Sequence, residues 1–438
     1  MSGVQGIAKI PELRRRILFT CLMLALFCFG AYVPIPGINA DVLKDIFGAN
    51  TLFGFINMIG GNTLKQMSIF ALGVMPYISA SIIFDLLKII WPYLKELSQE
   101  GEEGRKKITQ YVRYATVGLC LFQGSMLATF IGTQSSGGQA AVMDPGLEFT
   151  IRTILTLTTG TMLLMWMGEQ ITARGIGNGI SLIIFAGIAA SIWPNFRQMF
   201  SFVGAKGSDL AMLDVILVMA FIVLVIAFIV FMERGQRRIP IQYAKRIIGR
   251  KMYGGQSTHL PVKINSAGVI PPIFASSILT FPNTILQFAN VGILVMLANI
   301  INDSIVFNVI YVSFIIFFAY FYTSIVFNPQ DVSENLKKHG GYIPGIRPGS
   351  STAEYLEKVL YRITAGGALY IAAVCVVPNI VYTALGGQQL RFLTYDFGGT
   401  SIIILIGVAL DTVAQVESHL LTRHYEGFMK QAKMRGRR

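Results

Sequence analysis

The stretch VILVMAFIVLVIAFIVFM, residues 215–232, decides the fold class of this chain. All 18 of its residues are aliphatic, aromatic or methionine. At ~1.5 Å per residue, a helix of that length approaches the ~30 Å hydrocarbon core of a bilayer. Segments 17–33 and 305–327 likewise contain no charged residue. The sequence therefore predicts several helices that cross a membrane.

The composition of the whole chain agrees with that prediction. Of its 438 residues, 53% are hydrophobic and 13% are charged, whereas a soluble domain carries about 25% charged residues. Apolar runs separated by glycine and proline predict ten spanning helices, near residues 17–33, 70–92, 109–132, 149–172, 179–196, 211–232, 264–288, 304–327, 359–378 and 399–420. We therefore expect an all-α integral membrane protein.

The first apolar segment follows three arginines, Arg14, Arg15 and Arg16, as the apolar part of a secretory signal peptide would. It has no small-x-small cleavage pattern, however, and it runs directly into PIPG, residues 34–37. We therefore expect an uncleaved first helix.

Lysine and arginine are distributed unevenly between the predicted loops. With ten helices, 29 of the 36 basic residues lie on the side of the N-terminus or just inside it, and six lie on the opposite side. Because basic loops stay in the cytoplasm, both termini are predicted to be cytoplasmic.

The connection between the sixth and seventh helices, residues 233–263, is long and basic. In its segment RRIPIQYAKR, residues 237–246, the apolar side chains of Ile239, Ile241 and Tyr243 alternate as they do in a strand. This pattern predicts a protruding basic hairpin.

The connection between the eighth and ninth helices, residues 328–358, is also about 30 residues long. Its segment PGIRPG, residues 344–349, predicts a stiff turn that presents Arg347. Both connections could simply be topology signals among anionic lipid head groups. The alternative is that they dock acidic partners or ribosomal RNA, because clustered basic residues bind carboxylate and phosphate.

Signatures of common enzymes are absent from the sequence, which contains no HExxH, GxSxG or Walker A motif. Residues 175–179, GIGNG, look superficially like a nucleotide-binding loop. They lie between two membrane helices rather than after a strand, and they predict a tight turn. No histidine pair suggests a metal site. We expect no enzymatic activity, no cofactor and no metal.

The candidates for a relay or coupling site inside the membrane are Asp85, Lys88, Glu169, Asp411 and Glu417. Most are near cytoplasmic helix ends, and Asp411, the deepest, could make a polar contact between helices. None of them resembles a proton relay. The chain is therefore predicted to move something without binding it tightly.

Two features concern the arrangement of the helices. Residues 50–66 are apolar but too short and too rich in glycine to span, and could be a re-entrant segment or an amphipathic surface loop. Ten helices divide into an N-terminal half, residues 1–200, and a C-terminal half, residues 201–438. Such halves would insert in opposite orientations, although the sequence shows no convincing repeat.

Seven motifs along the chain resemble those of the SecY family, in the family's order and spacing. They are PIPG (34–37), SIFALGVMPYISASII (68–83), GEQITARGIGNG (168–179), YAKR (243–246), QSTHLP (256–261), PGIRPG (344–349) and GGTS (398–401). The resemblance covers essentially the whole chain. It implies a protein-conducting channel in the bacterial cytoplasmic (inner) membrane, in which two inverted five-helix halves form an hourglass pore that opens sideways between helices 2 and 7.

The resemblance also implies a ring of aliphatic side chains at the narrowest point of the pore. The ring positions are Val74, Ile78, Ile180, Ile184, Ile273 and Ile404. Relatives often have isoleucine at the position of Val74, so this ring would be slightly wider there. Branched aliphatic side chains would exclude water and ions by dewetting.

The family match further assigns residues 55–64 to a plug, a short helix seated on the outer side of the ring, and so favours the re-entrant interpretation. The plug residues are Phe55, Ile56, Asn57, Met58, Ile59, Gly60, Gly61, Asn62, Thr63 and Leu64. Gln123 matches a polar position at the lateral gate, although a hydrogen bond between helices is an alternative role. Asp85, also at the gate, stands where relatives often carry an uncharged polar residue.

The remaining expectations from the resemblance concern partners. Arg347, Lys245, Arg246 and Arg250 match positions that dock the motor ATPase SecA or a translating ribosome. SecE and SecG would be small membrane subunits, and the channel would also meet unfolded preprotein, its signal sequence and membrane lipids. The alternative function is a secondary transporter or flippase. A membrane-embedded enzyme is a third class, which the missing catalytic motifs disfavour.

Overall fold

The computed structural model describes most of the chain. The described residues are 11–39, 63, 67–133, 135–136, 139–142, 144, 146–202, 212–243, 246–248, 251–253, 257–288, 304–386 and 398–435.

Each of the ten expected spans falls on a long α-helix. These helices are α2 (Pro11–Ala31), α5 (Met75–Ile90), α7 (Glu102–Thr133), α8 (Leu147–Arg174), α9 (Gly179–Phe202), α10 (Met212–Arg234), α11 (Ile270–Phe288), α13 (Ser304–Val326), α15 (Ser350–Gly386) and α17 (Gly399–Arg435). Two shorter helices, α6 (Pro92–Gln99) and α14 (Pro329–Lys338), precede α7 and α15. The expected all-α fold is confirmed.

Several helix boundaries differ from the predicted ones. α5 begins at Met75 rather than near residue 70, because the preceding residues form turns and Gly73 has φ +57°. α11 begins at Ile270, immediately before Pro271 and Pro272, which suit the first turn of a helix. α15 starts nine residues before the expected ninth span.

By length and composition alone, five helices of the described part could cross a membrane, or up to seven if each of two bent pairs counts as one span. The bent pairs are α5 with α6, at 101°, and α8 with α9, at 116°. α2 is not among the five because its first two turns carry Arg14, Arg15 and Arg16. The break between α8 and α9 is the GIGNG segment, where Gly177 has φ +89°. The predicted tight turn is therefore confirmed.

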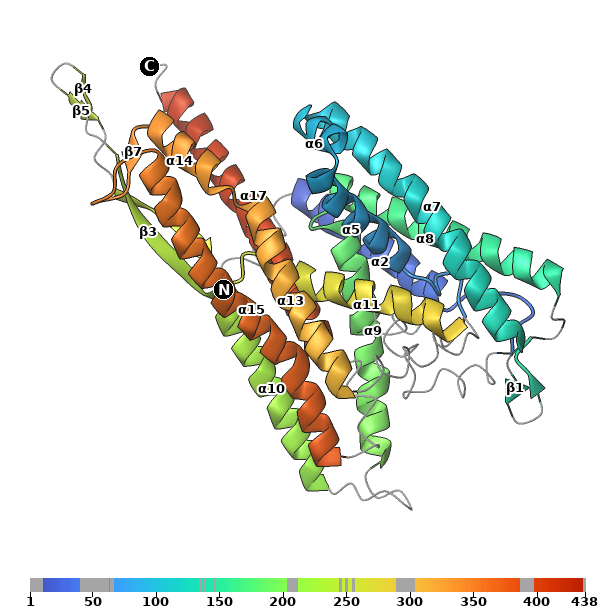
Figure 1. Cartoon of the computed structure of the whole chain (residues 1–438). Coiled ribbons are helices and arrows are strands. Elements are labelled where there is room, and N and C mark those ends of the chain that lie inside the picture. The colour runs from blue at the N-terminus through green and yellow to red at the C-terminus, as the bar shows by residue number, and fades with distance from the viewer. Residues whose placement is uncertain are drawn as a thin grey trace.

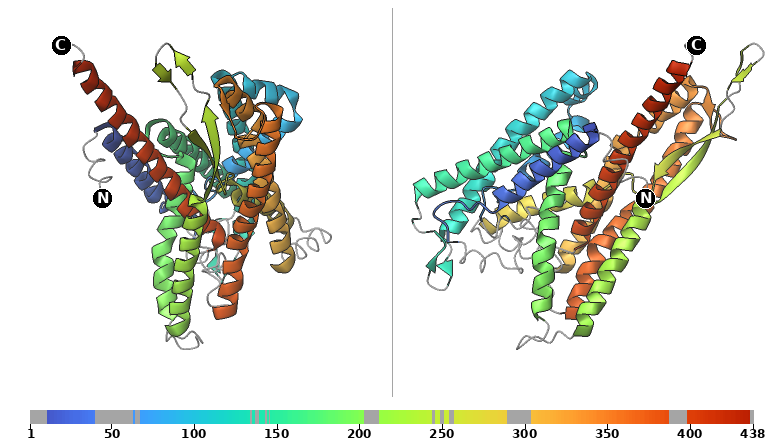
Figure 2. Two further views of the ribbon diagram at one scale, coloured as in Figure 1. Left: turned by 90° about the vertical axis from the view of Figure 1, so that its left-hand side faces the viewer. Right: turned by 180° about the vertical axis from the view of Figure 1, so that it is seen from behind.

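The helices form two groups, and two pairs of helices make the contacts between the groups (Figures 1 and 2). In the first group α2 packs on α8 and α9, and α7 packs on α5 and α8. In the second group α15 contacts α10, α13 and α17, and α11 contacts α13. Between the groups, α9 packs on α17 and α11 packs on α5. The division near residue 200 and the inverted relation of the two halves stay predictions.

The sixth-to-seventh connection forms the predicted hairpin. Strand β3 (Gln236–Tyr243) pairs antiparallel with β6 (Ser257–Lys263), and a smaller pair, β4 (Arg246–Ile248) and β5 (Lys251–Tyr253), lies beyond them at one tip of the molecule (Figure 1). Ile239 and Ile241 are buried, as the alternation predicted. A third strand, β7 (Gly341–Tyr342), pairs with the other edge of β3, so the eighth-to-ninth connection joins the same sheet. A separate short pair, β1 (Ser135–Ser136) and β2 (Gln139–Ala140), follows α7.

The interior is divided into clusters of buried apolar side chains. The largest includes residues of both helix groups, from α2, α5, α8 and α9 on one side and from α10, α11, α13, α15 and α17 on the other. A smaller cluster lies beneath the three-stranded sheet, where Ile239, Val262 and Ile343 meet Leu356 and Leu360 of α15. The sheet is thus packed on the helices rather than free of them.

Candidate functional site

The six aliphatic positions expected to form a ring gather in the largest apolar cluster. Five of them are buried members of the cluster, and Ile180 is partly buried and packs against it. All six lie at the N-cap or within the first six residues of their helices, α5, α9, α11 and α17. Because the cluster extends far beyond these six residues, the ring itself stays a prediction.

The segment before α5 is held tightly, which fixes the position of Val74. The ring of Phe70 stacks on Phe27 of α2, with centroids 5.9 Å apart. The Thr161 hydroxyl of α8 donates a hydrogen bond of 3.2 Å to the carbonyl oxygen of Gly73. A Cβ atom on Gly160 would clash with the Ile69 backbone, so α8 can approach this closely only with glycine there. These contacts explain much of the SIFALGV motif.

The start of α9, with Ile180 and Ile184, depends on a close crossing with α8. A Cβ atom on Gly179 would clash with the carbonyl oxygen of Gly168. The Gly179 amide donates to the Thr172 hydroxyl at 2.9 Å, and the Ile180 amide donates to the Asn178 side chain at 3.2 Å. The GEQITARGIGNG motif therefore builds this crossing and caps the helix.

The GGTS motif positions Ile404 in a similar way. A Cβ atom on Gly399 would clash with the carbonyl oxygen of Val374, so the start of α17 lies directly against the backbone of α15. The Thr400 hydroxyl lies 2.8 Å from the hydroxyl of Tyr311 on α13 and donates to Cys375 Sγ at 3.6 Å. This buried polar contact ties three helices together one turn before Ile404. Apart from the motif itself, no pattern of residues predicted this contact.

The plug expected at residues 55–64 lies outside the described residues, apart from Thr63. Thr63 is 1% exposed, and its carbonyl oxygen accepts a hydrogen bond of 2.9 Å from the amide of Ser68.

The two expected gate residues lie on neighbouring helices. Gln123 is half-buried on α7. The Asp85 carboxylate on α5 pairs with the ammonium of Lys88 one turn later, at 2.7 Å, and both side chains are about one-third exposed. The i,i+3 spacing of this pair could have been read from the sequence. α5 contacts α11, the helix expected on the other side of the gate.

Other charged residues inside the predicted spans also find partners. Arg113 of α7 makes a two-pronged contact with Glu169 of α8, at 3.1 Å and 2.6 Å, which locks the two helices. Asp411 is exposed and lies 3.8 Å from Lys263 of β6, so its partner is on a strand rather than on another helix. The alternative of a polar contact between Asp411 and another helix stays untested.

The loop that carries Arg347 is anchored on both sides. Ile343 is buried in the cluster beneath the sheet. The buried Ser333 hydroxyl of α14 donates to the Gly349 carbonyl oxygen at 2.6 Å, and the Thr352 hydroxyl donates to the Arg347 carbonyl oxygen at 2.8 Å. The Arg347 side chain is exposed. A fixed backbone thus presents an exposed guanidinium.

The basic residues expected at the tip of the hairpin are only partly described. The backbone of Arg246 opens β4. Lys245, Arg250 and the side chain of Arg246 lie outside what the structure describes. Nearer the helices, Arg237 and Arg238 of β3 are exposed.

Comparison with known proteins places these features in a family. The SecY family model matches residues 68–413. The translocase subunit SecY of Escherichia coli K12 is 46% identical over 434 residues, covering 98% of this chain and 96% of that protein. The subunit from Vibrio cholerae is 46% identical over 437 residues, with the same coverage.

Solved structures of channels share the fold. A protein-conducting channel matches with a TM-score of 0.66 at 16% identity, covering 95% of this chain and 97% of that chain. Sec61 in the canine ribosome–channel complex matches with a TM-score of 0.62 at 15% identity and the same coverage. The family match over residues 68–413 and the 46% identity along nearly the whole chain lead to one conclusion: this chain belongs to the SecY family.

Proposed function

We infer that the chain is the membrane-embedded, protein-conducting subunit of a translocase, which moves unfolded polypeptides across the membrane and membrane proteins sideways into it. The observation that carries this inference is the 46% identity to translocase subunits along 98% of the chain. The fold shared with channel structures supports it.

The closed channel would be sealed by Val74, Ile78, Ile180, Ile184, Ile273 and Ile404. Five of them are buried in one apolar cluster and Ile180 packs against it, from helices of both groups, which supports this assignment. Side chains without hydrogen-bonding groups hold water out of a narrow passage, and ions stop where water is absent. Flexible aliphatic side chains could still part around an extended polypeptide and close behind it.

Residues 55–64 would reinforce the seal as a plug on its outer side. The burial of Thr63 and its backbone hydrogen bond to Ser68 support this, because they anchor one end of the segment inside the protein. The anchor lies 11 residues before Val74, and residues 67–73 between them are packed tightly against α2 and α8, so plug and seal would be closely connected.

The lateral exit would open between α5 and α11, which are in contact. Gln123 and Asp85 would line its edge. The ion pair with Lys88 supports a place for Asp85 near lipid, because a neutralised carboxylate costs less there than a free one.

The two basic connections would dock the driving partner. The exposed Arg347 on an anchored loop supports a specific contact with a carboxylate or a phosphate. The relatives Sec61 and yeast Ssh1 have been seen bound to ribosomes, which supports a ribosome as one partner. We further propose the motor ATPase SecA, the membrane subunits SecE and SecG, and contacts of Lys245, Arg246 and Arg250 with these partners or with ribosomal RNA.

The site does not favour a secondary transporter or flippase, the alternative function. Those proteins bind a solute through polar groups near the bilayer centre, whereas the six aliphatic positions here have no polar atom. The chain is a multi-pass membrane protein, and we propose the bacterial cytoplasmic membrane with both termini in the cytoplasm.

Reconstitution tests the proposed function. Proteoliposomes that contain the chain with co-purified small subunits should protect an added secretory precursor from protease when the motor and ATP are present. The chain should also bind empty ribosomes in a salt-sensitive way. Absence of protected precursor, together with uptake of a small solute, would favour a transporter instead.

A further inference from the structure

A short linker, residues 264–269, connects the three-stranded sheet to α11. β6 ends at Lys263, and α11 begins at Ile270. α11 carries Ile273 and forms one side of the lateral exit proposed above, where it contacts α5. The conformation of the linker therefore determines where α11 starts.

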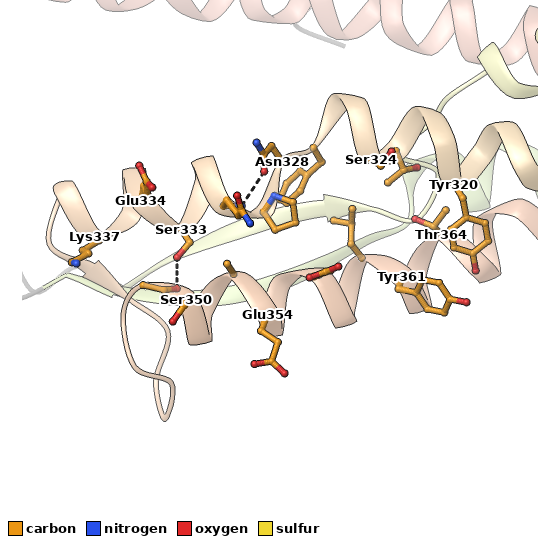
Figure 3. A pocket seen from close by; sticks show the side chains of 18 residues that line it. Tyr320, Ser324, Asn328, Ser333, Glu334, Lys337, Ser350, Glu354, Tyr361 and Thr364 are labelled. Carbon is orange, nitrogen blue, oxygen red and sulfur yellow. Dashed lines mark hydrogen bonds between the residues drawn. The ribbon is translucent and has the colours of Figure 1, made fainter. Parts of the chain in front are cut away.

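The sheet at one end of the linker is packed on helices of the second group. Figure 3 shows its strands running along α14 and α15. Val262 of β6 belongs to the buried cluster that includes Leu356 and Leu360 of α15. α15 also contacts α10 and α17. We call the three-stranded sheet together with α10, α15 and α17 the base.

The backbone of the linker lies directly against this base. The amide of Ile264 donates a hydrogen bond of 3.0 Å to the carbonyl oxygen of Gly235, just after α10. A Cβ atom on Gly367 of α15 would lie 2.6 Å from the Ile264 carbonyl oxygen, and one on Gly407 of α17 would lie 2.5 Å from the Val269 side chain. Glycine at these two positions therefore allows both helices to approach the linker closely.

The side chain of Asn265 adds a polar contact between the linker and α10. Asn265 is 4% exposed, and its Nδ2 donates to Glu233 Oε1 at 2.6 Å and to the Gly268 carbonyl oxygen at 3.1 Å. The second bond is local and supports the turn at Gly268, which has φ +64°. The first bond reaches a helix 32 residues earlier in the chain, and its carboxylate acceptor makes it a strong, charge-assisted bond.

This contact joins two helices that otherwise pack on different neighbours. α11 packs on α13 and α5, whereas α10 packs on α15 and α17. The bond between Asn265 and Glu233 therefore links the start of α11 to the end of α10. A movement of α11 away from α5, which would open the exit, would pull on this link.

We propose that Asn265 and Glu233 are positioning residues whose hydrogen bond, which we call the clamp, holds the start of α11 against the base and stabilises the closed exit. This inference rests on the proposed function. A local turn needs only the bond to Gly268, so the clamp accounts for the additional reach to Glu233. Because a bond to a charged group stabilises more than a neutral one, losing the clamp should shift the closed–open equilibrium on the order of 10-fold toward opening.

Removal of the acceptor and of the donor tests the clamp in the full chain with its co-purified subunits. Glu233→Leu should raise the resting open probability in planar bilayers on the order of 10-fold and allow export of a precursor with a defective signal sequence. Glu233→Gln keeps an oxygen acceptor and should stay close to the parent. Asn265→Ala should open the channel at least as much as Glu233→Leu. The double variant should open no further than Asn265→Ala alone, because both substitutions break the same bond.

The matched control is Glu354→Leu, which removes an exposed carboxylate paired with Lys358 at 2.7 Å within α15. Its open probability should equal that of the parent. Export of an intact precursor by the parent tests the proposed function separately from the clamp. Thermal unfolding of each variant reports the stability of the fold.

Three results would each overturn the proposal. Lower thermal stability without a raised open probability would mean that Asn265 and Glu233 only support the fold. Equal opening of Glu233→Leu and Glu233→Gln would mean that the hydrogen bond is not involved, and additive effects in the double variant would mean that the two residues act separately. If Glu233→Leu fails to accumulate, the comparison of Asn265→Ala with Glu233→Gln decides.

Discussion

Replacing Ile404 with asparagine should shift the channel from its closed toward its open state. Ile404 is 1% exposed and lies in the apolar cluster that we assign to the seal. Burial of an isoleucine side chain contributes about 1.5–3 kcal/mol relative to leaving it in water. Asparagine lacks this stabilisation in the closed state, whereas in the open, water-filled passage the substitution changes the free energy little. The closed–open equilibrium should therefore shift by about 10- to 150-fold toward opening.

Two assays read out this shift. Single-channel recording in planar bilayers should show resting ion conductance in Ile404→Asn and little in the parent. Cells with this variant should also export a precursor whose signal sequence is defective, since less free energy is needed to open the channel. Ile404→Leu should behave like the parent, because apolar volume is nearly conserved.

A neighbouring residue supplies the matched control. Ile403 is equally buried, at 0% exposed, but its side chain leaves the helix about 100° away from that of Ile404. Ile403→Asn should lower the stability of the fold without making the channel leak. Equal conductance of Ile404→Asn and Ile404→Leu, or equal leakage from the asparagine variants at 403 and 404, would refute the assignment of Ile404 to a hydrophobic seal.

Three further changes test other parts of the molecule. Arg347→Glu should abolish precursor export at normal protein levels, since losing a desolvated charge contact costs about 2–5 kcal/mol. The control is Arg152→Glu, at an exposed arginine in the first turns of α8. Normal export by the Arg347 variant would remove that residue from docking. Deleting residues 55–64 should leave a folded channel with raised resting conductance, and failure of the protein to accumulate would mean that the segment is structural rather than a plug. Gly399→Ala should destabilise the protein by about 1–3 kcal/mol, because the added methyl meets the Val374 backbone. The control, Gly366→Ala, should leave the stability unchanged, because its methyl meets nothing within 4 Å. Equal thermal unfolding of the two variants would contradict the contact.

The helices were predictable because long apolar runs have few other structures open to them. Every expected span fell on a helix, and the alternation at Ile239 and Ile241 predicted β3 correctly. Helix starts were less predictable, because they depend on tertiary contacts. The start of α5 at Met75, for example, follows from the turn at Gly73 and its hydrogen bond from Thr161, 88 residues away.

The candidate site was predictable only through the family resemblance. Isoleucines spaced like Ile180 and Ile184 are common in membrane helices, and nothing in their spacing distinguishes a pore from a core. The ion pair of Arg113 with Glu169 joins residues 56 positions apart, and no local sequence pattern predicts it. Lys88 is different, because its spacing from Asp85 suits an ion pair on one helix face, and this pair could have been proposed from the sequence.

Because β7 pairs with β3, the sixth-to-seventh and eighth-to-ninth connections depend on each other, both in evolution and in engineered chimeras. Gln242 and Tyr243 pair with Tyr342 and Gly341, so segments from two separate connections depend on one register. A shift of one residue in either strand would turn every side chain to the opposite face of the sheet. A chimera that takes the sixth-to-seventh connection from a relative should therefore work only if the eighth-to-ninth connection comes from the same donor, and the two loops are expected to change length together or not at all.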